Sequence, residues 1–174
     1  MELRTARLVL RPWNRQDEAA LVRHANNRNI WIRVGDRFPH PYTRKDARRW
    51  LKTRHHSPYP PTNFAITLEG EAIGGVGFER KRDLARMTAE VGYWLSEMHW
   101  GKGYATEVVQ AIAQYAFERF DFVRLEARVL EGNAASSRVL EKAGFSLETT
   151  MRQAGFKDGR VLDMLLYARL KPVP

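Results

Sequence analysis

The sequence contains no cysteine. It can therefore form no disulfide framework and no thiolate site, whether a metal centre or a catalytic nucleophile. It also lacks an apolar run of about 18 residues, the length that crosses a bilayer as a helix. The opening residues 1–4 have no apolar core of a secretion signal. We therefore expect a soluble cytoplasmic protein that makes no membrane contact and holds no metal.

Internal repeats, low-complexity segments and linkers are also missing from the 174 residues. A chain of this length can bury a sizeable core in one unit, so we expect residues 1–174 to form a single domain. Period-2 patterns predict strands near 4–12, 63–68, 72–79, 88–95, 124–130, 145–151 and 161–170. Asn14 with Asp17, and Thr43 with Asp46, have the spacing of helix-starting caps. Together these patterns predict one α/β domain with a mixed sheet.

Acidic residues are scarce in one part of the chain only. Residues 1–54 hold 14 Lys or Arg against 5 Asp or Glu, whereas residues 55–174 hold 15 of each. The net charge of +9 therefore lies wholly in the first third. Such a surface favours an acidic partner, or a phosphate-rich one such as a ribosome, through electrostatic steering. The alternative is a solvated helix face with no partner.

The most informative segment is Trp100-Gly101-Lys102-Gly103-Tyr104-Ala105-Thr106-Glu107. It follows an apolar strand pattern at 90–95 and precedes a helical pattern that reaches Arg119. A glycine turn at a helix N-terminus leaves backbone N–H groups unpaired, and these donors favour an anion, most often phosphate. An ordinary strand-to-helix turn is the alternative. The segment is neither a P-loop nor a dinucleotide fingerprint, because Thr106 stands where the latter needs its third glycine.

The spacing of this turn resembles the R/Q-x-x-G-x-G/A pyrophosphate loop of the GNAT acyl-CoA N-acetyltransferases. Gly103 and Ala105 occupy its last two places, and Trp100 stands where the family often has Arg or Gln. The form W-G-x-G-Y-A-T-E resembles the branch that acetylates ribosomal-protein N-termini, the RimJ/RimL type, in which Trp is common at this place.

Three further segments carry the same resemblance in the same order. Residues 5–12 (TARLVLRP) resemble the opening strand of the branch, and residues 72–78 (AIGGVGF) the strand that pairs with the catalytic one. Residues 133–145 (NAASSRVLEKAGF) resemble its N-x-x-S…E-K-x-G-F helix. The resemblance therefore covers nearly the whole chain.

The resemblance implies the fold and the cosubstrate. The GNAT sheet is mixed, mostly antiparallel and seven-stranded, with flanking helices and a splay between its central strands. Acetyl-CoA would lie with its pyrophosphate on residues Trp100, Gly101, Lys102, Gly103, Tyr104, Ala105 and Thr106. Its pantetheine would follow strand 91–95, with Leu95 or Ser96 donating to the thioester oxygen and Asn133 bonding an amide.

Transfer of an acetyl group to an amine requires a base that accepts a proton from the ammonium form. The segment Ala89-Glu90-Val91 resembles the place of the glutamate base in histone-type members, so Glu90 is our first candidate. The alternative is a strand carboxylate paired with an arginine. The ribosomal-protein branch can instead carry a glutamate before the final strand, but Gly155 stands at that place here.

The departing thiolate needs a proton or a hydrogen bond. Many GNAT enzymes use a tyrosine seven residues after the helix asparagine, where this chain has Leu140. Ser136, three residues after Asn133, resembles a serine to which the ribosomal-protein branch gives this role. The alternative for Asn133 and Ser136 is a local helix cap.

The acceptor side carries weaker signals. Trp31 and Tyr42 fall in the segment that shapes the acceptor slot in the family, and Asp163 could orient an amine or form a salt bridge. His55-His56 is not expected to bind metal, because adjacent residues do not converge on one ion.

We therefore expect an acetyl-CoA-dependent N-acetyltransferase that acts on a primary amine. The N-terminal α-amine of a protein, ribosomal or acidic, is the first candidate for the acceptor. A polyamine, amino acid or antibiotic is the second. A non-catalytic RNA- or ribosome-binding module on the same fold is the alternative outside the class. Association with the ribosome and pairing into a homodimer, as in relatives of this branch, are further expectations.

Overall fold

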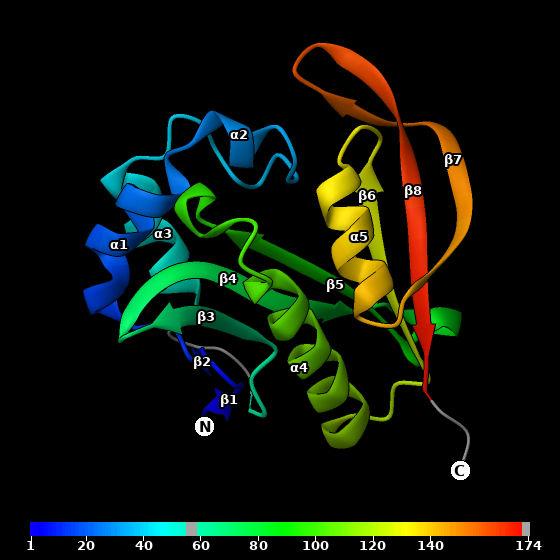
Figure 1. Cartoon of the computed structure of the whole chain (residues 1–174), viewed down its shortest axis with the longest axis horizontal. Coiled ribbons are helices and arrows are strands. Elements are labelled where there is room, and N and C mark those ends of the chain that lie inside the picture. The colour runs from blue at the N-terminus through cyan, green and yellow to red at the C-terminus, as the bar shows by residue number, and fades with distance from the viewer. Residues whose placement is uncertain (55–58, 172–174) are drawn as a thin grey trace.

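An eight-stranded sheet organises the protein, and helices cover both of its faces (Figure 1). The computed structural model describes residues 1–54 and 59–171. The strands are β1 (Leu3–Arg4), β2 (Val9–Arg11), β3 (Asn63–Leu68), β4 (Glu71–Arg80), β5 (Thr88–Leu95), β6 (Arg124–Leu130), β7 (Ser146–Lys157) and β8 (Arg160–Leu170), and their order in the sheet is β1-β2-β3-β4-β5-β6-β8-β7. The main helices are α1 (Glu18–Ala25), α2 (Arg28–Trp31), α3 (Arg44–Arg54), α4 (Tyr104–Arg119) and α5 (Ala134–Lys142). Among these described strands, only β5 and β6 pair in parallel. The mixed, mostly antiparallel sheet is thereby confirmed.

The eighth strand arises at the N-terminus, where a single strand over 4–12 was expected and the prediction was wrong. The chain instead turns back between β1 and β2, with Leu3 opposite Leu10 and Arg4 opposite Val9. The Thr5 side chain closes this turn, because its hydroxyl bonds both the N–H and the carbonyl oxygen of Leu8. The turn projects Thr5 and Arg7 toward α4, and a continuous strand would not.

The central splay follows from where the β5–β6 ladder stops. The two strands pair only at Thr88–Arg124, Ala89–Leu125 and Glu90–Glu126. Beyond that point β5 continues to Leu95 beside β4, and β6 continues to Leu130 beside β8. The edge of β5 that faces β6 therefore lacks a strand partner from Val91 to Leu95 within the described residues.

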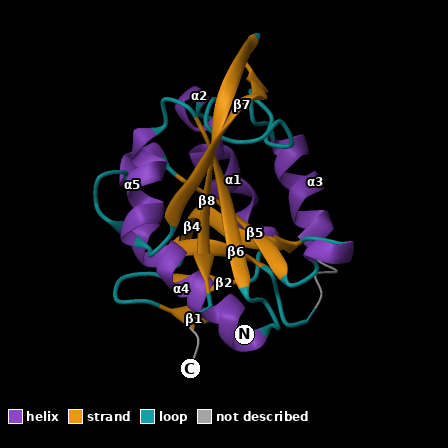
Figure 2. Cartoon of the chain, turned by 90° about the vertical axis from the view of Figure 1, so that its right-hand side faces the viewer, coloured by secondary structure: helices purple, strands orange, loops and turns teal. Residues whose placement is uncertain are grey.

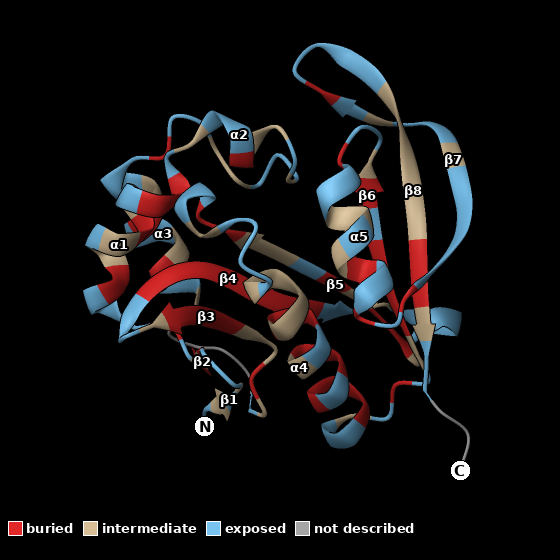
Figure 3. Ribbon diagram, in the orientation of Figure 1, coloured by how far each residue is buried: buried red, intermediate tan, exposed pale blue. Residues whose placement is uncertain are grey.

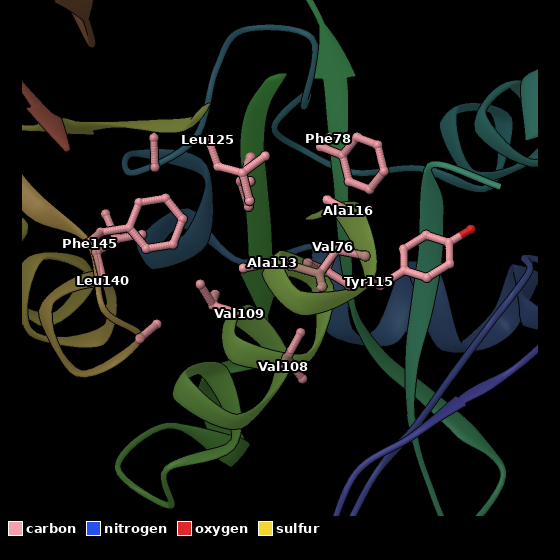
Figure 4. Close-up of a cluster of buried hydrophobic side chains, with 14 of the residues drawn as sticks. Val76, Phe78, Val108, Val109, Ala113, Tyr115, Ala116, Leu125, Leu140 and Phe145 are labelled. Carbon is pink, nitrogen blue, oxygen red and sulfur yellow. The ribbon is translucent and has the colours of Figure 1, made fainter. Parts of the chain in front are cut away.

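Two hydrophobic cores hold the two faces. Helices α4 and α5 lie on one side of the sheet and α3 on the other (Figure 2). The first core packs α4 side chains such as Val109 and Ala113 against Val76 and Leu125 of the sheet (Figure 4). The second core packs α1 and α3 against the opposite face, around Trp13, Leu21, Tyr42, Ala47 and Leu51. Burial of these apolar side chains is the main favourable contribution to the packing of the helices on the sheet.

The predicted caps set the helix ends. Asn14 and Asp17 form a reciprocal capping box at the start of a short 3-10 turn (Arg15–Asp17) that leads into α1. Thr43 and Asp46 bond in the same reciprocal way before α3. Asn133 caps α5, whose C-terminal end is followed by Gly144 at φ +83°, the left-handed region that favours glycine.

The last hairpin is longer than the sequence pattern indicates. β7 was expected to end at Met151 but continues to Lys157, and it is exposed along most of its length (Figure 3). The register shifts between Met151 and Gly155, where Gln153 takes a positive φ of +55°. Beyond this bulge the tip of the hairpin lies toward α2 (Figure 1). None of the helices in residues 1–54 and 59–171 is long and apolar enough to span a membrane.

Candidate active site

The glycine turn has the geometry expected of an anion site. α4 begins at Tyr104, directly after Gly103, whose φ is +81°. Gly101 also lies in the left-handed region, at φ +74°, with open space where a Cβ would stand. Gly103 occupies the N-cap position of α4 and has no side chain that could accept from the helix. The first backbone N–H groups of α4 are therefore not covered by a cap, and the positive end of the helix dipole adds to their attraction for an anion.

Arg7 braces this turn from the N-terminal segment, a role that the sequence did not predict. Its guanidinium donates to the carbonyl oxygen of Lys102 at 2.8 Å and to Glu107 at 2.9 Å. The Arg7 Cζ lies 4.5 Å from the centroid of the Tyr104 ring. Burial acts to raise the pKa of the Glu107 carboxyl, but hydrogen bonds from Thr5 and Arg7 outweigh it and hold that pKa below its ordinary value. The N-terminal turn and the first turn of α4 thus form one hydrogen-bonded unit.

Trp100 joins the glycine turn to the end of β5. Its indole Nε1 donates to the carbonyl oxygen of Leu95 at 2.8 Å, and the Arg33 Cζ lies 5.4 Å from its ring centroid. The Trp that stands where the family often has Arg or Gln therefore holds the turn against the strand.

Leu95 or Ser96 was expected to offer a backbone N–H to the thioester, and the structure shows where each N–H points. The Ser96 N–H donates to the Ile73 carbonyl oxygen of β4 at 2.8 Å, so it points away from the splay. Because alternate residues of a strand direct their N–H groups to opposite edges, the Leu95 N–H points toward the splay. Of these two residues, Leu95 and not Ser96 therefore has its backbone N–H on the free edge of β5.

Ser96 belongs instead to a chain of polar side chains that runs from the buried Ser96 and His24 to the exposed Glu71. Its hydroxyl lies 2.9 Å from His24 Nδ1, and His24 Nε2 lies 3.0 Å from Glu71 Oε1. His24 and Ser96 are 5% and 2% exposed. The hydrogen bond from His24 holds the pKa of Glu71 below its ordinary value. These contacts tie the end of β5 to α1 and β4.

Ser136 and Tyr93 meet on the α4–α5 side of the sheet. The Tyr93 hydroxyl lies 3.1 Å from Ser136 Oγ, and burial raises the pKa of Tyr93 to about 12. Asn133 accepts the Ser136 N–H at 3.3 Å, so its predicted capping role is confirmed. Tyr93 was not selected from the sequence, although its place two residues before Leu95 puts both side chains on one face.

Glu90 lies on the opposite face of the sheet, in a row of three glutamates. Glu79, Glu90 and Glu126 are direct cross-strand partners on β4, β5 and β6. Glu90 Oε2 lies 3.7 Å from Nε of Arg128, so the paired carboxylate that was the alternative for Glu90 is present in a loose form. Gly92, the next residue on this face of β5, is exposed, and a Cβ there would meet no atom within 4 Å. The surface beside Glu90 is therefore open at the centre of the sheet.

Aromatic side chains line the same face beyond Gly92. Phe38 packs with its ring centroid 5.3 Å from Trp94 and 5.1 Å from Tyr42. Tyr42, which was expected to line the acceptor slot, is buried in the second core and supports Phe38 from behind. Phe38 was not selected from the sequence.

Trp31 lies in what we call the clasp, formed by Arg28, Asp36, Lys157 and Asp158. Lys157 is 2% exposed in its side chain, bonds Asp36 at 2.9 Å and lies 4.2 Å from the Trp31 ring centroid. Arg28 bonds Asp158 at 2.7 Å and lies 5.5 Å from the same centroid. The clasp thus joins α2 and the segment after it to the tip of the β7–β8 hairpin, across the splay (Figure 1). No local pattern in the sequence marks Lys157.

The remaining sequence candidates have structural roles or lie elsewhere. Asp163 accepts the Gln153 N–H at 2.8 Å and so holds the β7 bulge; in residues 1–54 and 59–171 it forms no salt bridge. At Gly155 a Cβ would approach the Leu130 side chain to 2.9 Å, so a glutamate would not fit there without a shift. His55 and His56 lie outside the described residues.

The basic first third is partly neutralised within the molecule. Four of its arginines pair with acidic residues of the remainder: Arg7 with Glu107, Arg23 with Glu71, Arg28 with Asp158 and Arg37 with Glu79. The positive excess therefore contributes to joining the first third to the sheet and to α4.

Comparisons with known proteins agree with this geometry. The acetyltransferase (GNAT) domain family matches residues 7–146. The chain is 29% identical to the uncharacterized N-acetyltransferase YoaA of Bacillus subtilis (strain 168), over 98% of this chain and 97% of that protein. It is 36% identical to the ribosomal-protein-serine acetyltransferase of Escherichia coli (strain K12), over 62% of this chain and 59% of that enzyme.

Solved structures show the same fold. A RimL ribosomal L7/L12 α-N-protein acetyltransferase in complex with coenzyme A superposes with a TM-score of 0.85 at 23% identity, covering 98% of both chains. The Salmonella typhimurium acetyltransferase that modifies the N-terminal serine of L7/L12 gives 0.82 at 22% identity, covering 99% of this chain and all of that one. At this identity the likeness establishes the fold. Together with the family match, it shows that the chain belongs to the acetyltransferase (GNAT) domain family and is an N-acetyltransferase.

Proposed function

We propose that the protein transfers the acetyl group of acetyl-CoA to the N-terminal α-amine of a protein, with a ribosomal protein as the first candidate. The similarity to the ribosomal-protein-serine acetyltransferase and to the RimL structure supports this acceptor class. The observation that carries the proposal is the end of the β5–β6 ladder at Glu90. It leaves an open strand edge between a pair of hydroxyl groups on one face and a carboxylate on the other.

The residues on the α4–α5 side fit acetyl-CoA. The uncapped start of α4 and the two left-handed glycines suit a pyrophosphate, which needs close approach to backbone N–H groups. The free edge of β5 suits the pantetheine, whose amides can continue the ladder that β6 abandons. Trp100 and Arg7 hold these two parts together through Leu95 and Lys102.

Each residue role follows from its place at this edge. Glu90 accepts the proton that the acceptor ammonium loses, directly or through a water. The Leu95 N–H donates to the carbonyl oxygen as negative charge develops on it. The neutral amine nitrogen forms a bond to the carbonyl carbon, and the carbon–sulfur bond breaks. The extra proton of the acylated nitrogen passes to solvent, and the Ser136 hydroxyl donates a hydrogen bond to the departing thiolate. Tyr93 donates to Ser136 Oγ, so the serine hydrogen stays free for that donation.

The experiment is acetyl transfer followed by mass spectrometry, with release of free CoA recorded in parallel. The acceptors are N-terminal peptides of acidic and basic sequence, polyamines, amino acids and aminoglycosides. Acetylation at a peptide α-amine supports the proposal. Acetylation of small amines alone would move the protein to the metabolite or resistance class. Tight binding of acetyl-CoA without transfer to any acceptor would contradict the proposal.

The salt dependence of ligand binding distinguishes the proposed enzyme from the RNA-binding alternative. A binding module would lose affinity for a polyanion steeply as salt rises, because binding to nucleic acid releases condensed counterions. Acetyl-CoA binding would fall only modestly. Four of the basic residues in the first third already pair with acidic residues of the remainder, which weakens the support for that alternative.

A further inference from the structure

Arg128 is a cation with almost no partner, placed on the Glu90 face of the sheet, where we propose that the acceptor binds. It lies on β6 two residues beyond Glu126, the last residue of the β5–β6 ladder, and on the same face as Glu90. Its Nε lies 3.7 Å from Glu90 Oε2, which is too long for a hydrogen bond. Within residues 1–54 and 59–171 the guanidinium has no other ion pair and no hydrogen bond. The side chains of Arg128 and Glu90 are 41% and 36% exposed, so both are open to a ligand.

The neighbours of this pair on the same face are engaged more closely. Glu126 bonds Lys81, and it also accepts from Arg124 Nε at 2.7 Å. Glu79 bonds Arg37 at 3.0 Å. Among the three glutamates of the row, Glu90 is therefore the one held by a contact too long to be a hydrogen bond. A guanidinium offers five N–H donors in a planar fork that suits a carboxylate, and here none of them is in a hydrogen bond within the described residues.

We infer that Arg128 is a specificity residue, which binds a carboxylate that the acceptor carries close to its reacting amine. This inference rests on the acetyl transfer in the proposed function, and it concerns the group that the acceptor carries beside its amine. An acceptor with an ammonium and a carboxylate a few bonds apart matches the spacing of Glu90 and Arg128, since each charge then faces its opposite. Two sources share this chemistry: the α-carboxylate of a free amino acid and the side-chain carboxylate of an acidic N-terminal residue.

Binding of such an acceptor also changes the surroundings of the base. When the acceptor carboxylate takes the Arg128 fork, it replaces Glu90 as the partner of the guanidinium. The Glu90 carboxylate can then receive the ammonium proton without the positive charge of Arg128 beside it. An acceptor with this carboxylate therefore removes the cation from beside Glu90. An amine without a carboxylate leaves Arg128 next to Glu90.

The test compares kcat/KM of the wild type, Arg128→Gln and Arg128→Lys on four acceptors. Free alanine carries only the α-carboxylate, and a C-terminally amidated Asp-Ala-Ala peptide carries only the side-chain carboxylate. Amidated Ala-Ala-Ala and butylamine carry neither. We expect Arg128→Gln to lower kcat/KM about 10- to 100-fold for the preferred carboxylate acceptor, the value of a charge-assisted hydrogen bond. We expect Arg128→Lys to recover part of that loss, because it keeps the charge without the fork. Arg119→Gln, an exposed arginine at the far end of α4, serves as the control.

An equal loss for all four acceptors would overturn the inference, since it would assign Arg128 to the reaction or to the fold. A second readout does not depend on turnover: calorimetric binding of N-acetylalanine and of the amidated N-acetyl-Asp-Ala-Ala peptide to the CoA complex. We expect one of these products to bind about 10-fold more weakly to Arg128→Gln. Equal binding to both proteins, or no binding to the wild type, would overturn the inference. Failure of every acceptor to react would contradict the proposed function, while product binding would still decide the role of Arg128.

Discussion

The two sides of β5 are built in different ways. The residues that we propose to contact acetyl-CoA form what we call the cofactor side (Tyr93, Leu95, Trp100, Gly101–Thr106, Asn133 and Ser136). They are mainly backbone groups from a nearly continuous segment and one helix start. The residues of the opposite face, where we propose that the acceptor binds, form the acceptor side (Trp31, Phe38, Glu90, Arg128 and Lys157). They are side chains brought together from distant places in the sequence. Lys157 and Asp36 are 121 positions apart, and Arg28 and Asp158 are 130 apart.

This difference explains how one fold can keep its cosubstrate while its acceptor changes. Backbone N–H groups at a glycine turn do not depend on which side chains surround them, so that site tolerates substitution nearby. The acceptor side depends on the charge and shape of each of its side chains, and several of them lie in loops or at a hairpin tip. We therefore expect substitutions at the glycine turn to change the affinity for acetyl-CoA. Substitutions on the acceptor side should change the transfer reaction without changing that affinity.

The largest effect is expected for Glu90→Gln on the acceptor side. The amide cannot take the ammonium proton, so kcat should fall about 100-fold or more while the affinity for acetyl-CoA stays within about twofold. The measurement is steady-state kinetics with a peptide acceptor, together with calorimetric titration of acetyl-CoA.

Glu79→Gln is the matched control, because Glu79 is the cross-strand neighbour of Glu90 on the same face. Its kcat should stay close to that of the wild type. Equal losses in the two variants would indicate that the row acts through its total charge, and the assignment of the base to Glu90 would fail.

Most of the fold could be predicted from the sequence because its signals are local. Strands β3 and β5 and helix α4 have the expected bounds, since each has a clear hydrophobic period. The β1–β2 turn was missed because Thr5 and Arg7 bond to Glu107, about a hundred positions away. β7 was predicted too short because its extension carries a bulge and exposed residues without a period.

The candidate site also contains residues that the sequence identified and residues that it did not. The glycine turn was found by its place between a strand and a helix, and Asn133 and Ser136 by the resemblance to the family. In the structure, Trp100 bonds Leu95 and Tyr93 bonds Ser136 at the end of β5. Arg128 and Lys157 could not be found, because a charged strand residue has no pattern that distinguishes a ligand contact from a solvated one. The roles of Glu90 and Ser136 stay predictions that kinetics must test.

The next largest loss of kcat is expected for the hydroxyl groups of Ser136 and Tyr93 on the cofactor side. Ser136→Ala removes the hydroxyl nearest the expected sulfur, and we expect kcat to fall at least about 10-fold. Tyr93→Phe keeps the serine but removes its partner, so its loss should be smaller. Because burial raises the pKa of Tyr93 to about 12, the tyrosine stays protonated through neutral pH. The kcat profile of Tyr93→Phe should therefore keep the wild-type shape between about pH 6 and pH 9. A changed shape, or an unchanged kcat for Ser136→Ala, would contradict these roles.

A smaller effect is expected for Gly103→Ala at the glycine turn. Gly103 has a φ of +81°, and a Cβ there would lie 3.3 Å from the Arg7 guanidinium. We expect the left-handed backbone to cost roughly 1 kcal/mol of stability. We expect the affinity for acetyl-CoA to fall about fivefold, because the added Cβ hinders the approach of the phosphates. Gly70→Ala is the control: its φ is +88° with open space around it, in the turn between β3 and β4. It should lose similar stability but no affinity, and equal affinity in the two variants would show that the turn does not bind the cosubstrate.

The smallest effect is expected for Glu107→Gln, which tests whether the N-terminal turn supports the cofactor side. The folded pKa of Glu107 lies below its ordinary value of 4.5, so its contribution to stability is present above that value and is lost as the pH falls through the folded pKa. We expect the free energy of unfolding to fall by about 1 kcal/mol at neutral pH, and the difference from the wild type to shrink as the pH drops below about 4. The affinity for acetyl-CoA should fall about threefold, since Arg7 would lose the carboxylate that holds it against Lys102. Urea unfolding across this pH range and calorimetric titration measure both quantities. Glu118→Gln, an exposed change on the same helix, should alter neither. A stability difference that does not depend on pH would mean that Glu107 acts through packing and not through its charge.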